Sequence, residues 1–370
     1  MIIGIDASHA NKIKRTGVEE YCFQIIQELK KIIPPQVRVV LYSPIQLLPE
    51  LTLLPSNWEV KILSWPFKKL WSQVPLTYEL YKNPPDLYFS PGQLLPFFSP
   101  KNSVVTVHDS AFEAYPVAYH FWGRQYLKRM NRLIIKKAKL ILTSTFFNKS
   151  EMLRYYGRMF VESKELFDKI KVVPLAYDNM IVSNSSDGVN KFGKYILSIG
   201  RLEEKKNTRR LVKAFDQLRH YQKDLKLVLI GGPGAGYEAV KKAIATSPYQ
   251  KDIIQLGRIE FKDKINLLKY ASVFVFPSLY EGFGIPVLEA MAVGVPVVAS
   301  DIEALREVGG EAVTYVDPFN IEDIASKIFT LLHDQTYRDQ QIKAGLQQAD
   351  KFTWAKTAKE SWDIITHLPV

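Results

Sequence analysis

Two glutamates, Glu281 and Glu289, lie eight positions apart around a glycine-rich turn. The run before the turn, residues 273–277, is apolar, β-branched and aromatic, which predicts a buried parallel strand. Residues 282–286 read Gly-Phe-Gly-Ile-Pro; the glycines permit a sharp turn, and the proline suits the first turn of a helix. A strand, a glycine turn and a helix N-terminus predict an anion site, because unpaired N–H groups and the helix dipole both favour negative charge there.

The two carboxylates indicate a second kind of recognition, because carboxylates bind hydroxyl groups rather than phosphates. Glu289 lies two helical turns beyond the glycine turn, too far in to cap the helix, and a charge on this apolar helix needs a bonding partner. The segment therefore predicts a pocket for a sugar-bearing nucleotide. The alternative is an ordinary strand–helix turn of a Rossmann-like domain with two surface glutamates.

The same segment resembles a known family. Residues 281–300 follow the string E-G-F-G-x-P-x-x-E-A-M-A-x-G-x-P-V-V-A-S, which is similar to the donor-site signature of the retaining, GT-B fold glycosyltransferases of glycosyltransferase family 4 (group 1). The resemblance implies an α/β chain with two facing Rossmann-like domains, parallel sheets and a cleft between them. It implies that Glu281 approaches the transferring sugar, that Glu289 bonds the ribose, and that further donor contacts come from Gly282, Phe283, Gly284 and Ile285.

A basic pair, Arg201 and Lys206, lies in segment 198–208, between a predicted strand and a predicted helix. Breaking the bond from a sugar to a diphosphate builds negative charge on the leaving group, and an enzyme without a metal must neutralise it with Arg or Lys. The pair resembles the family residues that hold the donor diphosphate, with Gly200 beside them. The alternative is a solvated charge run, which is our interpretation of the neighbouring Glu203, Glu204, Lys205, Arg209 and Arg210.

Two further turns follow predicted strands. By resemblance the glycine loop 231–236 lies near the nucleotide, and Arg258 and Ile259 lie near its base; a plain turn after a strand is the alternative.

The sequence has no D-x-D triplet and no histidine cluster with ligand spacing, so it implies no metal. We expect no cofactor, with a nucleotide diphosphate sugar, GDP-mannose or a UDP-sugar, as the substrate.

The first half of the chain offers two candidates. Gly17, after Thr16, begins a predicted helix whose amides can face the diphosphate. The resembling family usually has a small-residue or double-glycine loop at this place, whereas this chain has only Gly17 with Thr16. The alternative is a glycine that simply starts a helix. His108 ends a predicted strand and, with Asp109, resembles the family's H-D motif beside the sugar. We expect His108 to bond a donor hydroxyl rather than act as a general base, unless it is a structural histidine. Asp109 is expected to orient His108 or to cap the next segment.

The 370 residues predict two domains. We expect an acceptor-side domain at 1–180 and a donor-binding domain at 190–352, joined by a polar linker at 178–190; by resemblance, the helix at 353–370 packs back on the first domain. Strands alternate with helices, which favours parallel sheets. The expected strands are 2–6, 37–42, 87–89, 104–107, 140–143, 195–199, 225–230, 253–256, 273–277 and 295–299, and the expected helices 17–33, 208–220, 237–245, 261–270 and 353–368.

The net charge of +11 is uneven: residues 1–180 carry 24 Lys and Arg against 15 Asp and Glu, and residues 181–370 carry 25 against 23. No nucleic-acid-binding motif accompanies this charge, so an anionic acceptor or membrane surface explains it better. A single cysteine, Cys22, suits a reducing cytoplasm, and no run of about 18 apolar residues predicts a membrane span. We expect a cytoplasmic protein with possible peripheral contact at the inner face of the membrane.

Two features of the basic half bear on the acceptor. Residues 61–71 mix lysines with large aromatics, as surfaces in a lipid headgroup layer do, with core packing of Trp65 and Trp71 as the alternative. Basic residues at i, i+4 spacing predict a stripe along one helix, which is equally a solvated helix face; they are Arg124, Lys128, Arg132 and Lys136.

The expected function is transfer of a hexosyl unit from a nucleotide diphosphate sugar to a hydroxyl of a glycan or lipid-linked acceptor. Residues 4–7 and the context of His108 look most like bacterial mannosyltransferases of polysaccharide or glycolipid assembly, so GDP-mannose is the first donor. The alternatives are a transferase that uses UDP-glucose or UDP-N-acetylglucosamine, a GT-B fold sugar-nucleotide epimerase, and a non-catalytic nucleotide-binding module.

Overall fold

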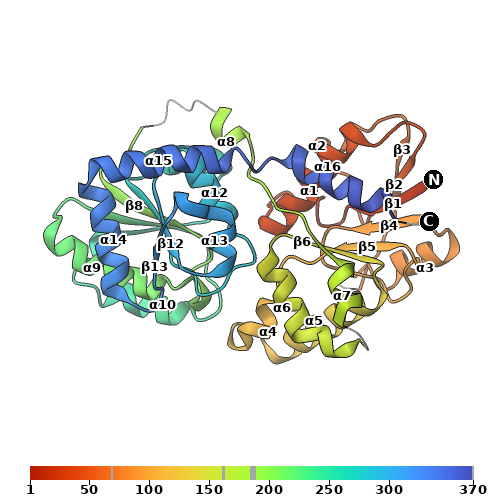
Figure 1. The fold of residues 1–370 in the computed structure, drawn as a ribbon, viewed down its shortest axis with the longest axis horizontal. Helices are drawn as coiled ribbons and strands as arrows, with labels where there is room; N and C mark the ends of the chain where they lie inside the picture. The colour runs from red at the N-terminus through yellow and green to blue at the C-terminus, as the bar shows by residue number, and fades with distance from the viewer. Residues whose placement is uncertain (68–69, 161–162, 184–188, 369–370) are drawn as a thin grey trace. The chain divides into compact units, whose positions relative to one another are not determined.

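The computed structural model describes residues 1–67, 70–160, 163–183 and 189–368, which form two compact units (Figure 1). Unit 1 comprises Met1–Ala114, Phe121–Leu175 and Trp354–Val370, and unit 2 comprises Tyr115–His120 and Ala176–Thr353. The predicted linker falls at the start of the long second segment of unit 2. Its residues 180–183 form a short helix, and residues 184–188 lie outside the described part of the chain.

Unit 1 is built on a parallel sheet in which the described strands follow the order β3-β2-β1-β4-β5-β6-β7. The central strand β1 pairs with β2 on one side and β4 on the other, with Ile3 opposite both Val39 and Leu87. Such strands are buried on both faces, which explains their continuous apolar runs. The strands are β1 Ile2–Asp6, β2 Arg38–Ser43, β3 Trp58–Ile62, β4 Leu87–Ser90, β5 Ser103–Thr106, β6 Leu140–Thr143 and β7 Ile170–Val172.

The helices of unit 1 include one from the far end of the sequence. Helix α16 packs on α1, where the Trp354 ring lies 6.1 Å from that of Tyr21, and the Thr357 hydroxyl donates to the Pro174 carbonyl over 2.8 Å. The helices are α1 Gly17–Ile32, α2 Pro49–Thr52, α3 Pro75–Lys82, α4 Ala111–Ala114, α5 Phe121–Lys137, α6 Phe146–Tyr156, the 3-10 turn η2 Gly157–Met159, α7 Ser163–Lys169 and α16 Trp354–Thr366.

Unit 2 has its own parallel sheet, in the order β10-β9-β8-β11-β12-β13 within the described residues. Its strands are β8 Tyr195–Ile199, β9 Lys226–Ile230, β10 Ile253–Gly257, β11 Val273–Phe276, β12 Val297–Ser300 and β13 Thr314–Val316. Its helices are α8 Met180–Ser183, α9 Thr208–Tyr221, α10 Tyr237–Ala245, α11 Phe261–Lys269, α12 Ile285–Ala292, α13 Glu303–Gly309, α14 Ile321–His333 and α15 Gln335–Ala349, with 3-10 turns η1 Pro116–Ala118, η3 Glu204–Lys206, η4 Gln250–Asp252 and η5 Gly310–Ala312.

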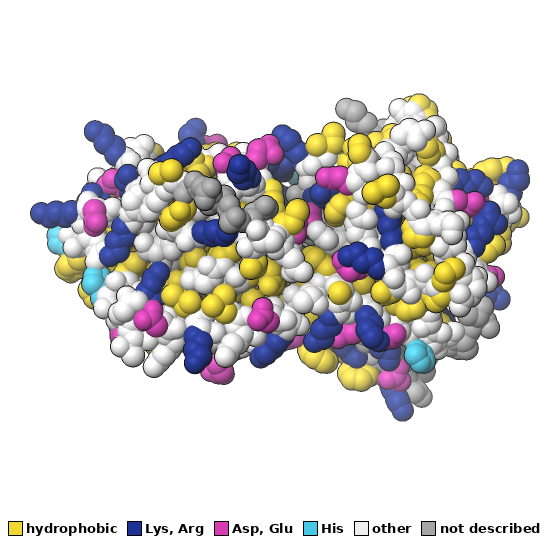
Figure 2. All heavy atoms as spheres, turned by 90° about the horizontal axis from the view of Figure 1, so that it is seen from above, with side chains coloured by type: hydrophobic (Ala, Val, Ile, Leu, Met, Phe, Trp, Pro, Cys, Tyr) yellow, Lys and Arg dark blue, Asp and Glu magenta, His cyan; other side chains and the backbone are white. Residues whose placement is uncertain are grey.

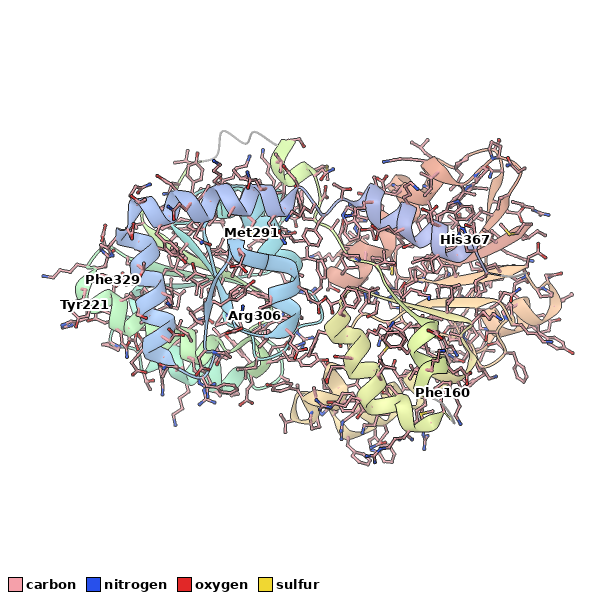
Figure 3. All side chains as sticks on the ribbon, viewed as in Figure 1. Phe160, Tyr221, Met291, Arg306, Phe329 and His367 are labelled. Atoms are coloured by element: carbon pink, nitrogen blue, oxygen red, sulfur yellow. The ribbon has the colours of Figure 1, made fainter. Side chains whose placement is uncertain are left out.

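Helices cover the unit 2 sheet through large apolar contacts. Phe215 of α9, Val240 of α10 and Ile328 of α14 share one buried cluster with the strands. Elsewhere in the unit, Met291 of α12, which is labelled in Figure 3, lies against Gly345 of α15. A Cβ added to Gly345 would be 3.3 Å from the Met291 side chain. Two parallel sheets, each covered by helices, confirm the predicted α/β class with two Rossmann-like domains.

The prediction missed several elements. None of the expected strands falls between residues 42 and 87, but this stretch contains β3, which pairs in parallel with β2 as an edge strand of the sheet. Only Trp58 of this strand is buried, because an edge strand has one side in solvent, so its sequence lacks the apolar run of an inner strand. Strands β7 and β13 are also edge strands, and each spans only three residues, too few to show an apolar run.

Surface charge and hydropathy complete the description. On the face shown in Figure 2, Lys and Arg side chains are interspersed with Asp and Glu rather than gathered in one patch. Every helix in the described part of the chain is too short or too polar to cross a membrane. The single cysteine, Cys22, is buried in α1.

Candidate functional site

The glycine turn has the predicted geometry of strand, turn and helix. Gly284 precedes α12 with φ of 112°, and a Cβ there would lie 2.7 Å from a Leu305 methyl, so the position requires glycine. Gly282 and Phe283 are buried, and Ile285 begins the helix. The Phe283 ring packs edge-on against Phe352 at 5.9 Å, which fixes the turn to its own unit.

Glu281, on this turn, forms an ion pair with Lys206. Both side chains are largely buried, and the Lys206 ammonium lies 4.9 Å from the centre of the Phe276 ring. Burial alone would raise the pKa of Glu281, but the charges of Lys206 and Lys205 outweigh it and lower that pKa. Glu281 is therefore ionised at neutral pH. The structure thus pairs directly two residues that were predicted to hold different parts of one substrate.

Arg201 is the accessible member of the basic pair. Its side chain is 60% exposed, and its guanidinium lies 3.3 Å from the carboxylate of Glu203. The expectation that Glu203 is solvated was wrong: Glu203 is buried, because the backbone folds over it at Gly234. A Cβ on Gly234 would lie 2.6 Å from the Cβ of Glu203, so the glycine makes room for this carboxylate.

The glycine loop 231–236 is hydrogen-bonded to the turn that carries Arg201 and Lys206, called here the basic turn. Leu202 donates its backbone N–H to the Gly232 carbonyl over 2.9 Å, and Gly234 donates in return to Leu202 over 3.0 Å. Gly231 has φ of 141°, and a Cβ there would lie only 2.0 Å from the Gly200 carbonyl oxygen. The loop therefore has a packing role that the sequence did not predict, whether or not it also contacts a ligand.

Arg258 and Ile259 follow β10, on the side of the sheet where the carboxyl ends of the strands lie. Arg258 is exposed and lies 3.8 Å from the Cβ position of Gly232, while Ile259 is half-buried. The neighbouring strands β10, β9, β8 and β11 are parallel, so their carboxyl ends lie on the same side of the sheet. The turns that follow the strands meet at this carboxyl edge. That edge brings together the unit 2 residues predicted for the donor: Gly200, Arg201, Lys206, Arg258, Ile259, Glu281, Gly282, Phe283, Gly284 and Ile285.

Glu289 lies inside α12 and is bonded to Lys264 of α11, with 2.7 Å between Nζ and Oε1. The Glu289 side chain is only 7% exposed and the Lys264 side chain 21%. The buried charge on α12 thus has the bonding partner that an apolar environment demands. Sequence reasoning missed Lys264, because a lysine 25 positions before its partner carries no local signal.

In unit 1, His108 lies two residues beyond the end of β5 and is buried. Its Nε2 lies 2.9 Å from the Pro91 carbonyl oxygen, which can only accept, so Nε2 carries the hydrogen and Nδ1 of the neutral ring is an acceptor. The Tyr21 ring meets His108 edge-on at 5.0 Å. Burial lowers the pKa of His108 and outweighs the opposing effects of the Pro91 bond and the Asp109 charge.

The other residues of unit 1 that bear on the predicted site have different structural roles. Gly17 begins α1 as predicted, and the Glu19 carboxylate accepts the Thr16 backbone N–H over 2.9 Å, as in a capping box. Asp109 accepts the Ala111 backbone N–H over 3.0 Å, so it caps α4. His9 was missed: its buried Nδ1 bonds no described residue, and its charge lowers the pKa of His108. Its place three residues beyond β1 was the available signal.

The lowered pKa of His108 predicts a pH effect on stability. Its folded pKa lies below the ordinary value of 6.5, so its contribution to stability is complete above 6.5 and is lost as the pH falls. We expect the melting temperature of the wild type to fall more steeply between pH 7.5 and 5 than that of His108→Gln. Thermal scans across this range measure the difference, and parallel curves would contradict the assignment.

The residues considered for the acceptor include both buried and exposed side chains. Trp71 is buried and donates its indole N–H to the Leu63 carbonyl over 2.7 Å, whereas Phe67 is exposed. Lys68 and Lys69 lie outside the described residues. In the basic stripe, Arg124 and Lys128 approach the Glu113 carboxylate at 3.7 and 2.7 Å, so only the remaining members, Arg132 and Lys136, are simply solvated.

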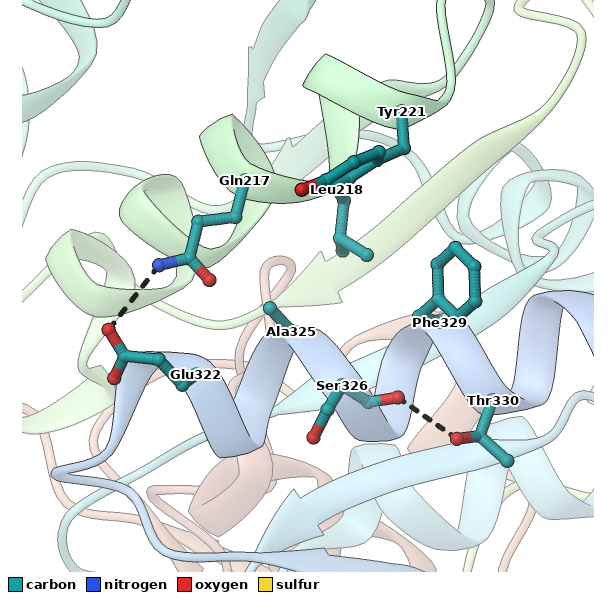
Figure 4. Close-up of a pocket in the computed structure, with 8 residues that line it drawn as sticks. All are labelled: Gln217, Leu218, Tyr221, Glu322, Ala325, Ser326, Phe329 and Thr330. Carbon is teal, nitrogen blue, oxygen red and sulfur yellow. Dashed lines mark hydrogen bonds between the residues drawn. The ribbon is translucent and has the colours of Figure 1, made fainter.

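A separate groove of about 440 Å³ runs between α9 and α14 (Figure 4). Tyr221 and Phe329 stand on opposite walls, and Gln217 contacts Glu322 at 3.5 Å across it. None of the predicted donor residues lines this groove. Among the described residues, His, Cys, Asp and Glu side chains form no group of three that could hold a metal ion.

Comparison with known proteins agrees with this geometry. Residues 184–348 match the family model described as glycosyl transferases group 1. The chain is 32% identical over 278 residues to O-antigen chain mannosyltransferase B of Escherichia coli, covering 72% of this chain and 71% of that protein. The chain therefore belongs to the group 1 glycosyl transferases.

Solved structures show the same fold. Anabaena Alr3699/HepE, solved with UDP-glucose, has a TM-score of 0.74 at 17% identity, with all of both chains covered. WaaG, a glycosyltransferase involved in lipopolysaccharide biosynthesis, has a TM-score of 0.72 at 14% identity, covering 99% of this chain and 100% of WaaG. The predicted GT-B fold is thereby confirmed, and the protein is a glycosyltransferase.

Proposed function

We propose that the protein is a retaining mannosyltransferase that moves mannose from GDP-mannose to a hydroxyl of a glycan or lipid-linked acceptor. The observation that carries the proposal is the convergence of two cations, a carboxylate and a helix N-terminus at the edge of the unit 2 sheet. The similarity to O-antigen chain mannosyltransferase B supports mannose and polysaccharide assembly. The fold shared with HepE, solved with UDP-glucose, keeps a UDP-sugar as the alternative donor.

In the proposed reaction, the bond between the anomeric carbon and the diphosphate oxygen breaks, and the acceptor oxygen bonds to the same carbon. The acceptor proton passes to the departing phosphate oxygen on the same face, so configuration is retained. Arg201 and Lys206 neutralise the negative charge that develops on the nucleoside diphosphate, without need of a metal or other cofactor. Lys206 has three N–H donors, so it can hold the diphosphate while it keeps its bond to Glu281.

The remaining site residues position the donor. Glu281 accepts a hydroxyl hydrogen bond from the sugar, and Glu289 accepts from the ribose. The amides of the glycine turn and of the helix that begins at Gly17 bind the diphosphate. The neutral His108 ring offers Nδ1 to a hydroxyl of the transferring sugar, since Pro91 holds its other nitrogen. Arg258 and Ile259 border the base.

Donor screening tests the function. We expect GDP-mannose to raise the melting temperature more than UDP-glucose or UDP-N-acetylglucosamine, because a ligand that binds only the folded form stabilises it. Slow release of GDP should accompany binding when no acceptor is present. Preference for a UDP-sugar would select the alternative transferase, and an isomerised sugar formed without acceptor would indicate an epimerase. Binding without turnover on any acceptor would favour a non-catalytic module.

The two glutamates are predicted to act on different parts of the donor. Glu289→Ala should weaken binding of free GDP or UDP by about tenfold, the value of one lost hydrogen bond to a charged group. Glu281→Ala should leave nucleotide affinity nearly unchanged and lower turnover. Calorimetric titration of both variants with both nucleotides decides the question. Equal loss of nucleotide affinity in the two variants would refute this division.

The basic charge of residues 1–180 leads to a prediction about membranes. A cytoplasmic enzyme that acts on a lipid-linked acceptor would gain about 1 kcal/mol for each basic residue near an anionic leaflet, less at high salt. We expect sedimentation with vesicles of anionic lipid at low salt, weakened when Lys68 and Lys69 are replaced by glutamate. The same replacement at Lys223 and Lys226 of unit 2 is the matched control. Failure to bind at low salt would remove the membrane contact and leave the transferase intact.

A further inference from the structure

The bond between Lys264 and Glu289 links two neighbouring helices of unit 2. The Lys264 ammonium lies 2.7 Å from Oε1 of Glu289, and no described residue bonds the other carboxylate oxygen, Oε2. Neither side chain has another described ionic partner. One oxygen of a nearly buried carboxylate is therefore fixed by a protein cation, and the other is available to a ligand.

We propose that Lys264 is a positioning residue for nucleotide recognition: it holds Oε1 of Glu289 so that Oε2 accepts the ribose hydroxyls of the donor. The inference rests on the proposed function, in which Glu289 bonds the ribose. Lys264 itself touches no substrate. The ligand that Glu289 would recognise is a ribonucleoside diphosphate, and a nucleotide that lacks the 2′ and 3′ hydroxyls would not make this contact.

The local structure explains why a lysine can do this. On α11, Ile265 and Leu268 face the core, and Lys264 lies at the edge of that apolar face. Its ammonium is 5.0 Å from the centre of the Phe261 ring, which favours a cation there. The long side chain can thus cover apolar surface while its charged end reaches Glu289.

The electrostatics of burial make Lys264 necessary for this geometry. A carboxylate that is 7% exposed is costly to keep charged without a partner. Without Lys264, the Glu289 carboxylate would lose the cation that holds it in place and would turn toward water. A rotated carboxylate no longer faces the ribose, so recognition of the diol is weakened.

The neighbouring Lys262 provides a matched control. It lies two positions earlier on the same helix, is exposed, and has no ion pair among the described residues. Lysine and methionine have similar helix propensities, so Lys264→Met and Lys262→Met change the helix equally and differ in the bond to Glu289. Lys264→Arg keeps the cation and serves as the rescue variant.

The experiment is calorimetric titration of the full chain with GDP and UDP and with the 2′,3′-dideoxy form of each. The wild type and Lys262→Met should prefer the ribose form of the nucleotide that they bind. Lys264→Met should lose about tenfold in affinity for that form, the value of one hydrogen bond to a charged group, and should bind the dideoxy form as the wild type does. Lys264→Arg should recover part of the preference.

Two results would overturn the proposal. If Lys264→Met keeps the full preference for ribose, Lys264 does not position Glu289. If it loses affinity for both forms equally, the ion pair only holds α11 to α12. Should Lys264→Met fail to fold, Lys264→Gln, which keeps a neutral N–H donor, is measured against the same criteria.

Glu289→Ala separates this inference from the proposed function. If Glu289→Ala abolishes the ribose preference and Lys264→Met does not, only the role of Lys264 is wrong. If Glu289→Ala itself keeps the preference, Glu289 does not bond the ribose, and the donor assignment fails together with the inference.

Discussion

Replacing Lys206 by alanine is expected to remove roughly 2–4 kcal/mol of transition-state stabilisation, which lowers turnover by about 1.5 to 3 orders of magnitude. The ammonium is the cation buried beside the glycine turn, where the diphosphate would develop charge. Because Glu281 would then be buried without its bonded cation, the variant should also be less stable by about 1–3 kcal/mol. Initial rates with saturating donor, together with thermal unfolding, measure both effects.

Arg201→Ala separates these two effects. Arg201 is 60% exposed, and among the described residues its ion pair is with Glu203, so its removal should lower turnover with a smaller fall in melting temperature than Lys206→Ala causes. A double variant with Lys206→Ala should lose less than the sum of the single losses if both cations act on one leaving group. Wild-type activity in both single variants would remove the diphosphate role.

Replacing Gly231 by alanine is expected to cause the largest loss of stability among single substitutions near the site. A Cβ at this position would lie 2.0 Å from the Gly200 carbonyl oxygen, and the backbone φ of 141° is unfavourable for any residue with a side chain. The strands β8 and β9 would have to separate at their ends, which would displace Arg201. We expect a loss of about 3 kcal/mol or more and a loss of nucleotide binding.

The adjacent Gly232 is the control for this prediction. Its Cβ would meet only Arg258, at an ordinary 3.8 Å, and its φ lies outside the region that excludes side chains. Gly232→Ala should therefore fold and bind nucleotide nearly as the wild type does. Thermal unfolding with and without GDP or UDP compares the two variants, and equal stability would show that the loop does not brace the basic turn.

The parts of the site that were predicted correctly have causes that are local in sequence. The strand, the glycine turn and α12 follow from an apolar run, two glycines and a proline within 20 residues. His108 was found because a polar residue at the end of a buried strand stands out. Both elements depend on backbone preferences and strand burial, which neighbouring residues determine.

The parts that were missed depend on contacts between distant segments. Glu203 is buried because Gly234 passes over it, and no neighbour of Glu203 indicates this. Lys264 meets Glu289 only after α11 and α12 have packed, and β3 is a strand only because β2 offers it an edge. In each case tertiary packing decides the environment of a residue whose local sequence suits solvent equally well.

The return of α16 to unit 1 has a consequence for synthesis of the protein. Trp354 packs near Tyr21, which in turn contacts His108, so the last described helix completes the packing around an early part of the chain. On the ribosome, residues 1–175 emerge first and must wait for unit 2 to be translated before their final helix is available. During this interval the part of α1 around Tyr21 lacks the cover of α16, whereas unit 2 has every described element it contains as soon as residue 353 has emerged.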